Sequence, residues 1–305
     1  MLRVARKLLI TLRLWLKPFW GDNRVVRRRD ILTLPAILGA QETEGEFICP
    51  MDRDVHAKLP GKCPRCGMAL VAGVPAPVEY PVALSVTPTR IIPGQAIQLR
   101  LRIADPTPGR PSPPLQLIHE RLFHLFLIGP DLDFFAHEHP QLQDDGSFLL
   151  ETKLPTPGAY RLLCDFYPEQ GTPQMVAKTV IVTGHRLRHE SLAPDLGAKR
   201  VNGMTLKIET EPPIPIAAQR TRIVFHLQPT DRLEPFLGAW GHLLIASQDR
   251  QDLVHTHPFL ADPDRGYLQF NVIFPRPGVH RVWLQAQQAG EVLTAHFDVP
   301  VKRLS

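Results

Sequence analysis

The chain has 305 residues, of which 44% are hydrophobic, and it carries a formal net charge of +5. The positive excess is confined to residues 1–40, which hold nine Lys/Arg against two acidic residues, whereas the remainder holds 26 Lys/Arg against 28 Asp/Glu. A basic leader is typical of a targeting segment, and a slightly acidic body excludes a nucleic-acid-binding surface spread over the protein. We therefore expect no nucleic-acid partner.

Residues 1–40 are predicted to be an export signal. The basic run Arg27–Asp30 leads into an apolar stretch that ends in small residues at Ala40. This layout resembles a twin-arginine export signal, which implies a mature protein in the periplasm or elsewhere in the cell envelope. The alternative is a membrane helix over Leu8–Trp20, but two basic residues interrupt it and a span needs about 20 mostly apolar residues.

Residues 45–72 form a predicted metal-binding module rich in sulfur. The sequence Cys63-Pro-Arg-Cys66-Gly is typical of a metal knuckle, in which both thiolates point inwards and backbone N–H groups face the sulfurs. Cys49, followed by proline, would supply a third thiolate from a preceding turn. Two alternatives are a disulfide between Cys63 and Cys66, and a purely structural zinc that lets so short a segment fold.

The module also resembles a known family. The pattern Cys49-Pro-Met51, followed by Pro60-Gly-Lys-Cys63-Pro-Arg-Cys66-Gly-Met68, is similar to the small heavy-metal-binding domain. That domain occurs on periplasmic adaptor subunits of copper and silver efflux pumps and at the N-termini of some heavy-metal-transporting ATPases. The resemblance implies a heavy-metal ion as ligand and envelope metal-efflux components as partners.

The fourth ligand of this module stays open, because Asp52 and Arg53 replace the family's His-Pro. Met51 or Met68 would complete a soft set that favours Cu(I) or Ag(I), whereas His56 or Asp52 would favour Zn(II).

The rest of the chain is predicted to be all-β. Short apolar segments with Gly/Pro turns recur over residues 78–184 and 201–302, with a polar linker over 185–200. This spacing is typical of two immunoglobulin-like antiparallel β-sandwich domains that arose by internal duplication. The expected strands are Val82–Val86, Ala96–Ile103, Leu122–Ile128, Phe134–His139 and Tyr160–Phe166, then Met204–Ile208, Arg222–Leu227, His242–Ala246 and His280–Ala286.

Each repeat carries the histidine pattern H-x12-H-x-H-P. A hairpin with the four-residue loop 129–132 would set His124 directly opposite His137 and place His139 on the same face. Three imidazoles with an open position suit Zn(II) or Cu(II), and their arrangement resembles that of the carbonic anhydrases in geometry alone. The alternative is that His-x-His-Pro merely ends a strand and bonds to a loop. The six candidate ligands are His124, His137, His139, His242, His255 and His257.

Outside this repeated pattern, His119, His226 and His280 are interpreted as surface or boundary residues, and Cys164 as a buried apolar residue.

The leading functional hypothesis is an exported, non-catalytic protein that binds copper or zinc for sequestration or hand-off. One alternative is a zinc-dependent hydrolase or hydratase that uses the histidine triads, although no acidic base recurs in both repeats. The other is a structural interaction module of an envelope or efflux complex with a structural zinc. Motifs for nucleotide binding or serine hydrolysis are absent from the sequence.

Overall fold

The computed structural model describes residues 47–49, 55–65, 67–73, 78–169, 171–185 and 191–304. The predicted export signal lies outside these residues, as do the candidate ligands Met51 and Cys66. Within the described ranges, the only helical element is a 3-10 turn at Pro263–Arg265. No helix in the described part of the chain is both long and apolar enough to cross a bilayer.

The N-terminal module is a small antiparallel sheet with strand order β2-β1-β3. Its strands are β1 (Phe47–Ile48), β2 (His56–Ala57) and β3 (Val71–Ala72). So few paired residues cannot hold a fold alone, and the module instead centres on a buried cluster that contains both described cysteines.

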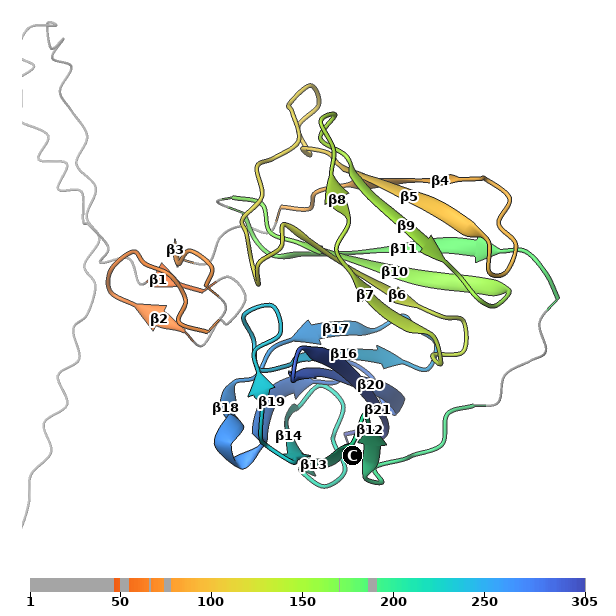
Figure 1. Ribbon diagram of the computed structural model, residues 1–305. Coiled ribbons are helices and arrows are strands. Elements are labelled where there is room, and N and C mark those ends of the chain that lie inside the picture. Colours follow the sequence, from red (N-terminus) through yellow and green to blue (C-terminus); the bar gives the residue numbers. More distant parts are fainter. Residues whose placement is uncertain are drawn as a thin grey trace, which may run out of the picture. The chain divides into compact units, whose positions relative to one another are not determined.

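The first repeat packs two four-stranded antiparallel sheets face to face (Figure 1). One sheet, in the order β4-β5-β9-β8, comprises Val82–Thr87, Ala96–Ile103, Phe148–Lys153 and Gln141–Leu142. The other, in the order β11-β10-β6-β7, comprises Gln174–Val182, Gly158–Phe166, Phe123–Ile128 and Phe135–Glu138. Strand β5 alternates between buried and more exposed residues, as expected for a strand with one face in a sandwich core.

The second repeat has the same plan (Figure 1). One sheet, in the order β12-β13-β14-β19-β18, comprises Lys199–Val201, Met204–Glu211, Arg220–Gln228, Tyr267–Ile273 and Leu260–Asp262. The other, in the order β15-β20-β16-β17 with β21 also paired to β20, comprises Leu233–Glu234, Gly278–Gln288, His242–Ser247, Leu253–Thr256 and Glu291–Val301. The all-β, duplicated, immunoglobulin-like fold is confirmed. Strand β12 begins inside the segment predicted as linker.

Strands β6 and β16 are buried on both faces, unlike the alternating strand β5. One face of β6, represented by Leu125 and Leu127, belongs to the core of its own sandwich. The other face, represented by Phe126, packs in a separate cluster with Leu244 and Trp283 of the second repeat. The two repeats therefore contact each other through β6 and β16, the strands that carry His124 and His242.

Candidate metal centres

The cysteine module has the local geometry of a knuckle. The Arg65 backbone N–H donates to Cys63 Sγ at 3.4 Å, and the Gly67 N–H donates to the Cys63 carbonyl at 2.9 Å. Gly67 has φ +77°, a left-handed conformation that glycine adopts without strain. Cys49 and Cys63 are 0% and 2% exposed, so both thiols lie inside the module.

The candidate fourth ligands of this module differ in burial. Met68 is 1% exposed and packs in the same cluster as Cys49 and Cys63. His56, on the short strand β2 opposite Ile48, has an exposed side chain. Burial thus groups the thioether of Met68, and not the imidazole of His56, with the two described thiols.

The predicted pairing of His124 with His137 is wrong by two residues. Strand β6 pairs Phe126 with His137 and Leu125 with Glu138, because the hairpin tip is residues 130–133 and not 129–132. The Gly129 N–H donates to the Phe134 carbonyl at 2.8 Å and closes this tip. A shift of two residues preserves the face on which each side chain lies, so the histidines still converge.

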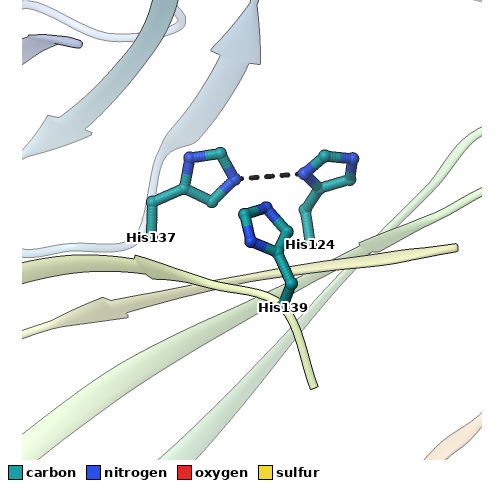
Figure 2. A group of neighbouring side chains, drawn as sticks. All are labelled: His124, His137 and His139. Carbon is teal, nitrogen blue, oxygen red and sulfur yellow. Dashed lines mark hydrogen bonds between the residues drawn. The ribbon is translucent and has the colours of Figure 1, made fainter. Parts of the chain in front are cut away.

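The first triad consists of His124 on β6, His137 on β7 and His139 just after β7. In Figure 2 the three rings turn towards one another, and one nitrogen of each lies within 4.8 Å of the others. His124 Nδ1 and His137 Nε2 are 3.1 Å apart. Two nitrogens that bind one tetrahedral ion at about 2.0–2.1 Å lie about 3.3 Å apart, so this pair already has a spacing close to that of metal ligands.

Hydrogen bonds on the far side of two rings set the tautomers of the first triad. His124 Nε2 donates to the Ile118 carbonyl at 3.1 Å. His137 Nδ1 donates to Gln285 Oε1 at 2.8 Å, and Gln285 Nε2 donates to Thr294 Oγ1, which orients the amide oxygen towards the imidazole. The facing nitrogens of His124 and His137 therefore both present lone pairs. Such an arrangement repels itself unless a cation lies between the nitrogens, and metal-binding histidines are oriented in this way.

The second triad is arranged similarly, except that its close pair joins His242 to the third histidine of the pattern, His257, and not to the second. His242 Nε2 donates to the Phe236 carbonyl at 2.9 Å, and His255 Nδ1 donates to Asp165 Oδ2 at 2.6 Å. His242 Nδ1 and His257 Nε2 are 3.1 Å apart, and one nitrogen of each of the three histidines lies within 4.8 Å of the others. His255 Nε2 is buried and has no hydrogen-bond partner in the structure, so its lone pair is not used by the protein.

Burial keeps the imidazoles neutral, which is the form that binds metals. Loss of solvation lowers the pKa of His124 to about 4 and that of His139 to about 3. The same cause, followed by the charges of neighbouring histidines, holds the pKa of His137, His242 and His257 well below the usual value. Five imidazoles thus remain available as ligands at mildly acidic pH.

The interpretation of His119 as a surface or boundary residue is wrong. His119 is 8% exposed, and its ring centroid lies 3.8 Å from that of His257 and 5.6 Å from that of His242. It occupies a turn with φ 48°, a conformation in which histidine is enriched among non-glycine residues. The second repeat carries Leu237 at the corresponding turn position, so the repeat pattern gave no signal for His119.

The interpretation of His280 as a surface or boundary residue is also wrong, whereas those of His226 and Cys164 are confirmed. His280 is 1% exposed and packs on the Phe274 ring, so it is a core residue. His226 has a 39% exposed side chain and lies 3.8 Å from Glu209, as a surface residue does. Cys164 is confirmed as a buried core residue, and burial raises the pKa of its thiol to about 12.

Two regions of the chain match known protein families. Residues 77–184 and 199–303 match the model of a family described as a domain of unknown function, DUF8832. The chain belongs to this family. Residues 47–72 match a second model, described as a heavy metal binding domain, which confirms the resemblance of the cysteine module at the level of the family. No curated protein shows a significant match.

Solved structures similar to this DUF8832 chain include sandwich proteins of low sequence identity. The Escherichia coli adhesin FdeC is 14% identical with a TM-score of 0.25, over 77% of this chain and 68% of that chain. The Yersinia pseudotuberculosis adhesin InvE is 11% identical with a TM-score of 0.25, over 72% of this chain and 60% of that chain. Two fibronectin type III domains of chicken tenascin are 10% identical with a TM-score of 0.22, over 72% and 100%. At these values the likeness carries no information on binding or activity.

Proposed function

We propose that this DUF8832 protein is an exported heavy-metal-binding protein that sequesters or hands off copper, with zinc as the second candidate. The observation that carries the proposal is the heavy-metal-binding-domain match over residues 47–72, in which Cys49 and Cys63 are both buried. Buried thiols grouped at a knuckle are the donor set that soft metal ions select.

The proposed ligands of the cysteine site are Cys49, Cys63 and Cys66, with Met68 as the fourth. Cys66 lies outside the described residues, and its role rests on the Cys-x-x-Cys spacing. Met68 is preferred over Met51 and His56 because it shares the buried cluster of the two described cysteines. Three thiolates and a thioether favour Cu(I) over Zn(II).

The two histidine triads are the proposed sites for Cu(II) or Zn(II). A contact through Ile118 supports hand-off between the two classes of site. Ile118 packs in the cluster of Cys49, Cys63 and Met68, and its carbonyl accepts the hydrogen bond from His124. An ion released by the thiols would therefore be near His124, a proposed ligand of the first triad.

Export and the partner are parts of the same proposal. The twin-arginine-like leader supports a location in the periplasm or cell envelope, where copper efflux components would be the partners that the resemblance implies. Outside the reducing cytosol both Cu(I) and Cu(II) would be present, so that the thiols could bind Cu(I) and the histidine triads Cu(II).

Metal content measured by inductively coupled plasma mass spectrometry tests the cysteine site. The full chain is purified from copper-supplemented cells as wild type, as the double variant Cys63→Ser/Cys66→Ser and as Cys164→Ala. We expect the double variant to hold one copper ion fewer per chain than wild type. Cys164→Ala is the matched control, because it removes a thiol that belongs to the sandwich core, and it should retain the wild-type content.

Equal metal content in the wild type and the double variant would remove the cysteine site from the proposal. A loss in the Cys164→Ala control of the same size would show that the measurement reports on protein damage and would also contradict the assignment.

A further inference from the structure

The two triads lie close enough together to act as one group. Ring centroids within a triad are separated by 4.7 Å for His137 and His139 and by 5.8 Å for His242 and His255. Between the triads, the centroids of His137 and His242 are 5.4 Å apart, and those of His124 and His255 are 6.2 Å apart. Imidazoles of different repeats are therefore nearly as close as imidazoles of one triad.

Each triad is also oriented by a side chain of the opposite repeat. His137 of the first repeat donates to Gln285 of the second, and His255 of the second repeat donates to Asp165 of the first. Asp165 pairs with His124 across β10 and β6, and Gln285 pairs with His242 across β20 and β16. The two orienting residues thus hold equivalent positions, and neither triad has its orienting residue in place unless the repeats are in contact.

The two orienting residues differ in charge, which makes the triads unequal. The side chains of Asp165 and His255 are each 2% exposed, and Asp165 Oδ1 has no hydrogen-bond partner in the structure. A buried carboxylate is costly without a compensating positive charge, and a carboxylate that orients a ligating histidine strengthens the binding of a metal ion. Gln285 is neutral and offers His137 no such charge.

From these observations we infer that the triads form a single two-metal centre across the contact between the repeats, in which the His242/His255/His257 site fills first. This inference rests on the proposed function. Asp165 supplies a negative charge to the first ion, whereas the second ion binds beside neutral Gln285 and is repelled by the first ion. Both ions stabilise the contact between the repeats, because their ligands and orienting residues come from both.

A Cu(II) titration of the full chain carrying Cys63→Ser/Cys66→Ser, which removes the knuckle thiols, tests the inference. Calorimetry should resolve two ions per chain, the first bound at least about tenfold more tightly than the second. Electron paramagnetic resonance should give an isolated Cu(II) signal at one equivalent. At two equivalents it should give a dipolar-broadened signal with a half-field transition.

Substitutions in the same background assign the two steps. Asp165→Asn keeps an oxygen that can accept from His255 but removes the charge, and it should weaken the tight step about 10- to 100-fold. Gln285→Glu, the matched exchange at the equivalent position, should strengthen the weak step. His137→Ala should abolish the weak step alone, and His255→Ala the tight step alone.

Two steps of equal affinity, two uncoupled Cu(II) signals, or an unchanged tight step in Asp165→Asn would overturn the inference. These results would leave the cysteine site intact, because that site is measured separately in the chain with its thiols. Conversely, loss of the cysteine site with a normal two-step titration would overturn the proposed function and leave the two-metal centre standing.

Discussion

His124 and His242 show how a duplicated position retains its chemistry. Each donates from Nε2 to the carbonyl of the residue six positions earlier, Ile118 and Phe236 respectively. Each of these carbonyls belongs to a tight turn with a positive φ, and the turn holds the acceptor against the ring. The six-residue spacing between the turn carbonyl and the histidine therefore fixes the orientation of the ring in both repeats.

The lowered pKa of His124 predicts that the metal-free protein is destabilised by acid. A histidine whose pKa falls from 6.5 when unfolded to about 4 when folded binds fewer protons in the native state, so stability is complete above pH 6.5 and is lost as the pH falls towards 4. His124 alone should cost about 2 kcal/mol between pH 7 and pH 5. Urea unfolding of the metal-free chain at the two pH values measures the loss.

The surface residue His226 provides the control for this experiment. His226→Gln also removes a histidine, but one whose side chain is 39% exposed, and the loss of stability at pH 5 should remain in this variant. A free energy of unfolding that is equal at pH 7 and pH 5 would contradict the burial of neutral imidazoles.

At the scale of strands, the alternation and turn signals predicted most of the elements but not their partners. Ala96–Ile103 is observed with the predicted bounds, and Gly158–Phe166 begins two residues before the predicted strand. The contact between the repeats was not predictable, since the mostly apolar sequences of β6 and β16 are also compatible with an ordinary core strand. For the same reason, the sequence could group each histidine triad but could not place the triads beside each other or find Asp165 and Gln285.

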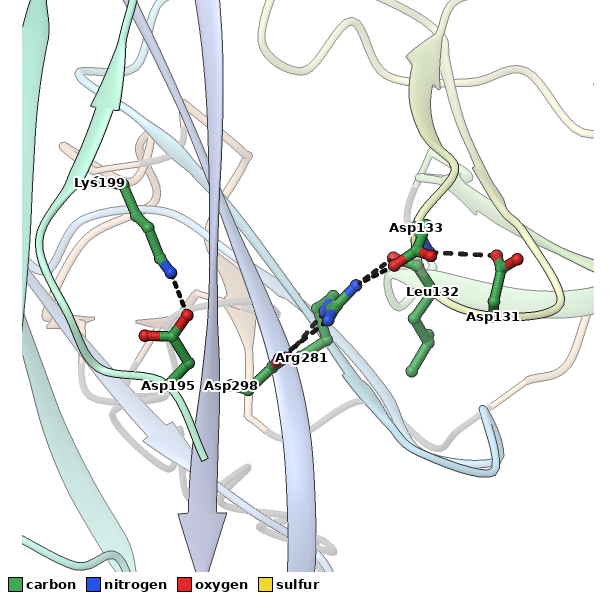
Figure 3. Close-up of polar contacts among 7 residues, drawn as sticks. All are labelled: Asp131, Leu132, Asp133, Asp195, Lys199, Arg281 and Asp298. Atoms are coloured by element: carbon green, nitrogen blue, oxygen red, sulfur yellow. Dashed lines mark hydrogen bonds and ion pairs between the residues drawn. The ribbon is translucent and has the colours of Figure 1, made fainter. Parts of the chain in front are cut away.

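Arg281 on β20 joins the two repeats through polar contacts (Figure 3). It donates two hydrogen bonds of 2.8 Å to Asp298 on the neighbouring strand β21. It also donates to the Leu132 carbonyl at 3.0 Å and to Asp133 Oδ1 at 2.8 Å, both in the hairpin tip of the first repeat. The tip that precedes the His137 strand is thus anchored by a buried guanidinium of the second repeat.

Replacement of Arg281 by an uncharged residue should lower the free energy of unfolding by a large amount. Arg281→Met would leave Asp298, which is 7% exposed, as an uncompensated buried charge, and should lower the free energy of unfolding by about 3–5 kcal/mol. Arg276→Met is the matched control, because Arg276 pairs with Asp249 and Asp252 at the surface, where water screens the charges, and it should cost much less than Arg281→Met. Urea denaturation measures both, and equal losses in the two variants would contradict the role of Arg281.

For the molecule as a whole, the two ligand classes lie in different modules that contact each other. The cysteine module is small and clusters around its thiols, whereas the histidines belong to sandwiches with cores of their own. Sequence spacing alone predicted both ligand classes, because a knuckle and a His-x-His strand are local patterns. The contact between them is made through Ile118, whose turn has no recognisable motif.

X-ray absorption spectroscopy at the zinc edge tests most directly whether the chain holds metal through both ligand classes. Zinc is a suitable probe because both donor sets bind it and it has no redox chemistry. The zinc-saturated wild type should show a sulfur shell at about 2.3 Å and an imidazole nitrogen shell at about 2.0–2.1 Å, and Cys63→Ser/Cys66→Ser should lose the sulfur shell alone. A spectrum of the saturated wild type that lacks either the sulfur shell or the imidazole shell would contradict the account.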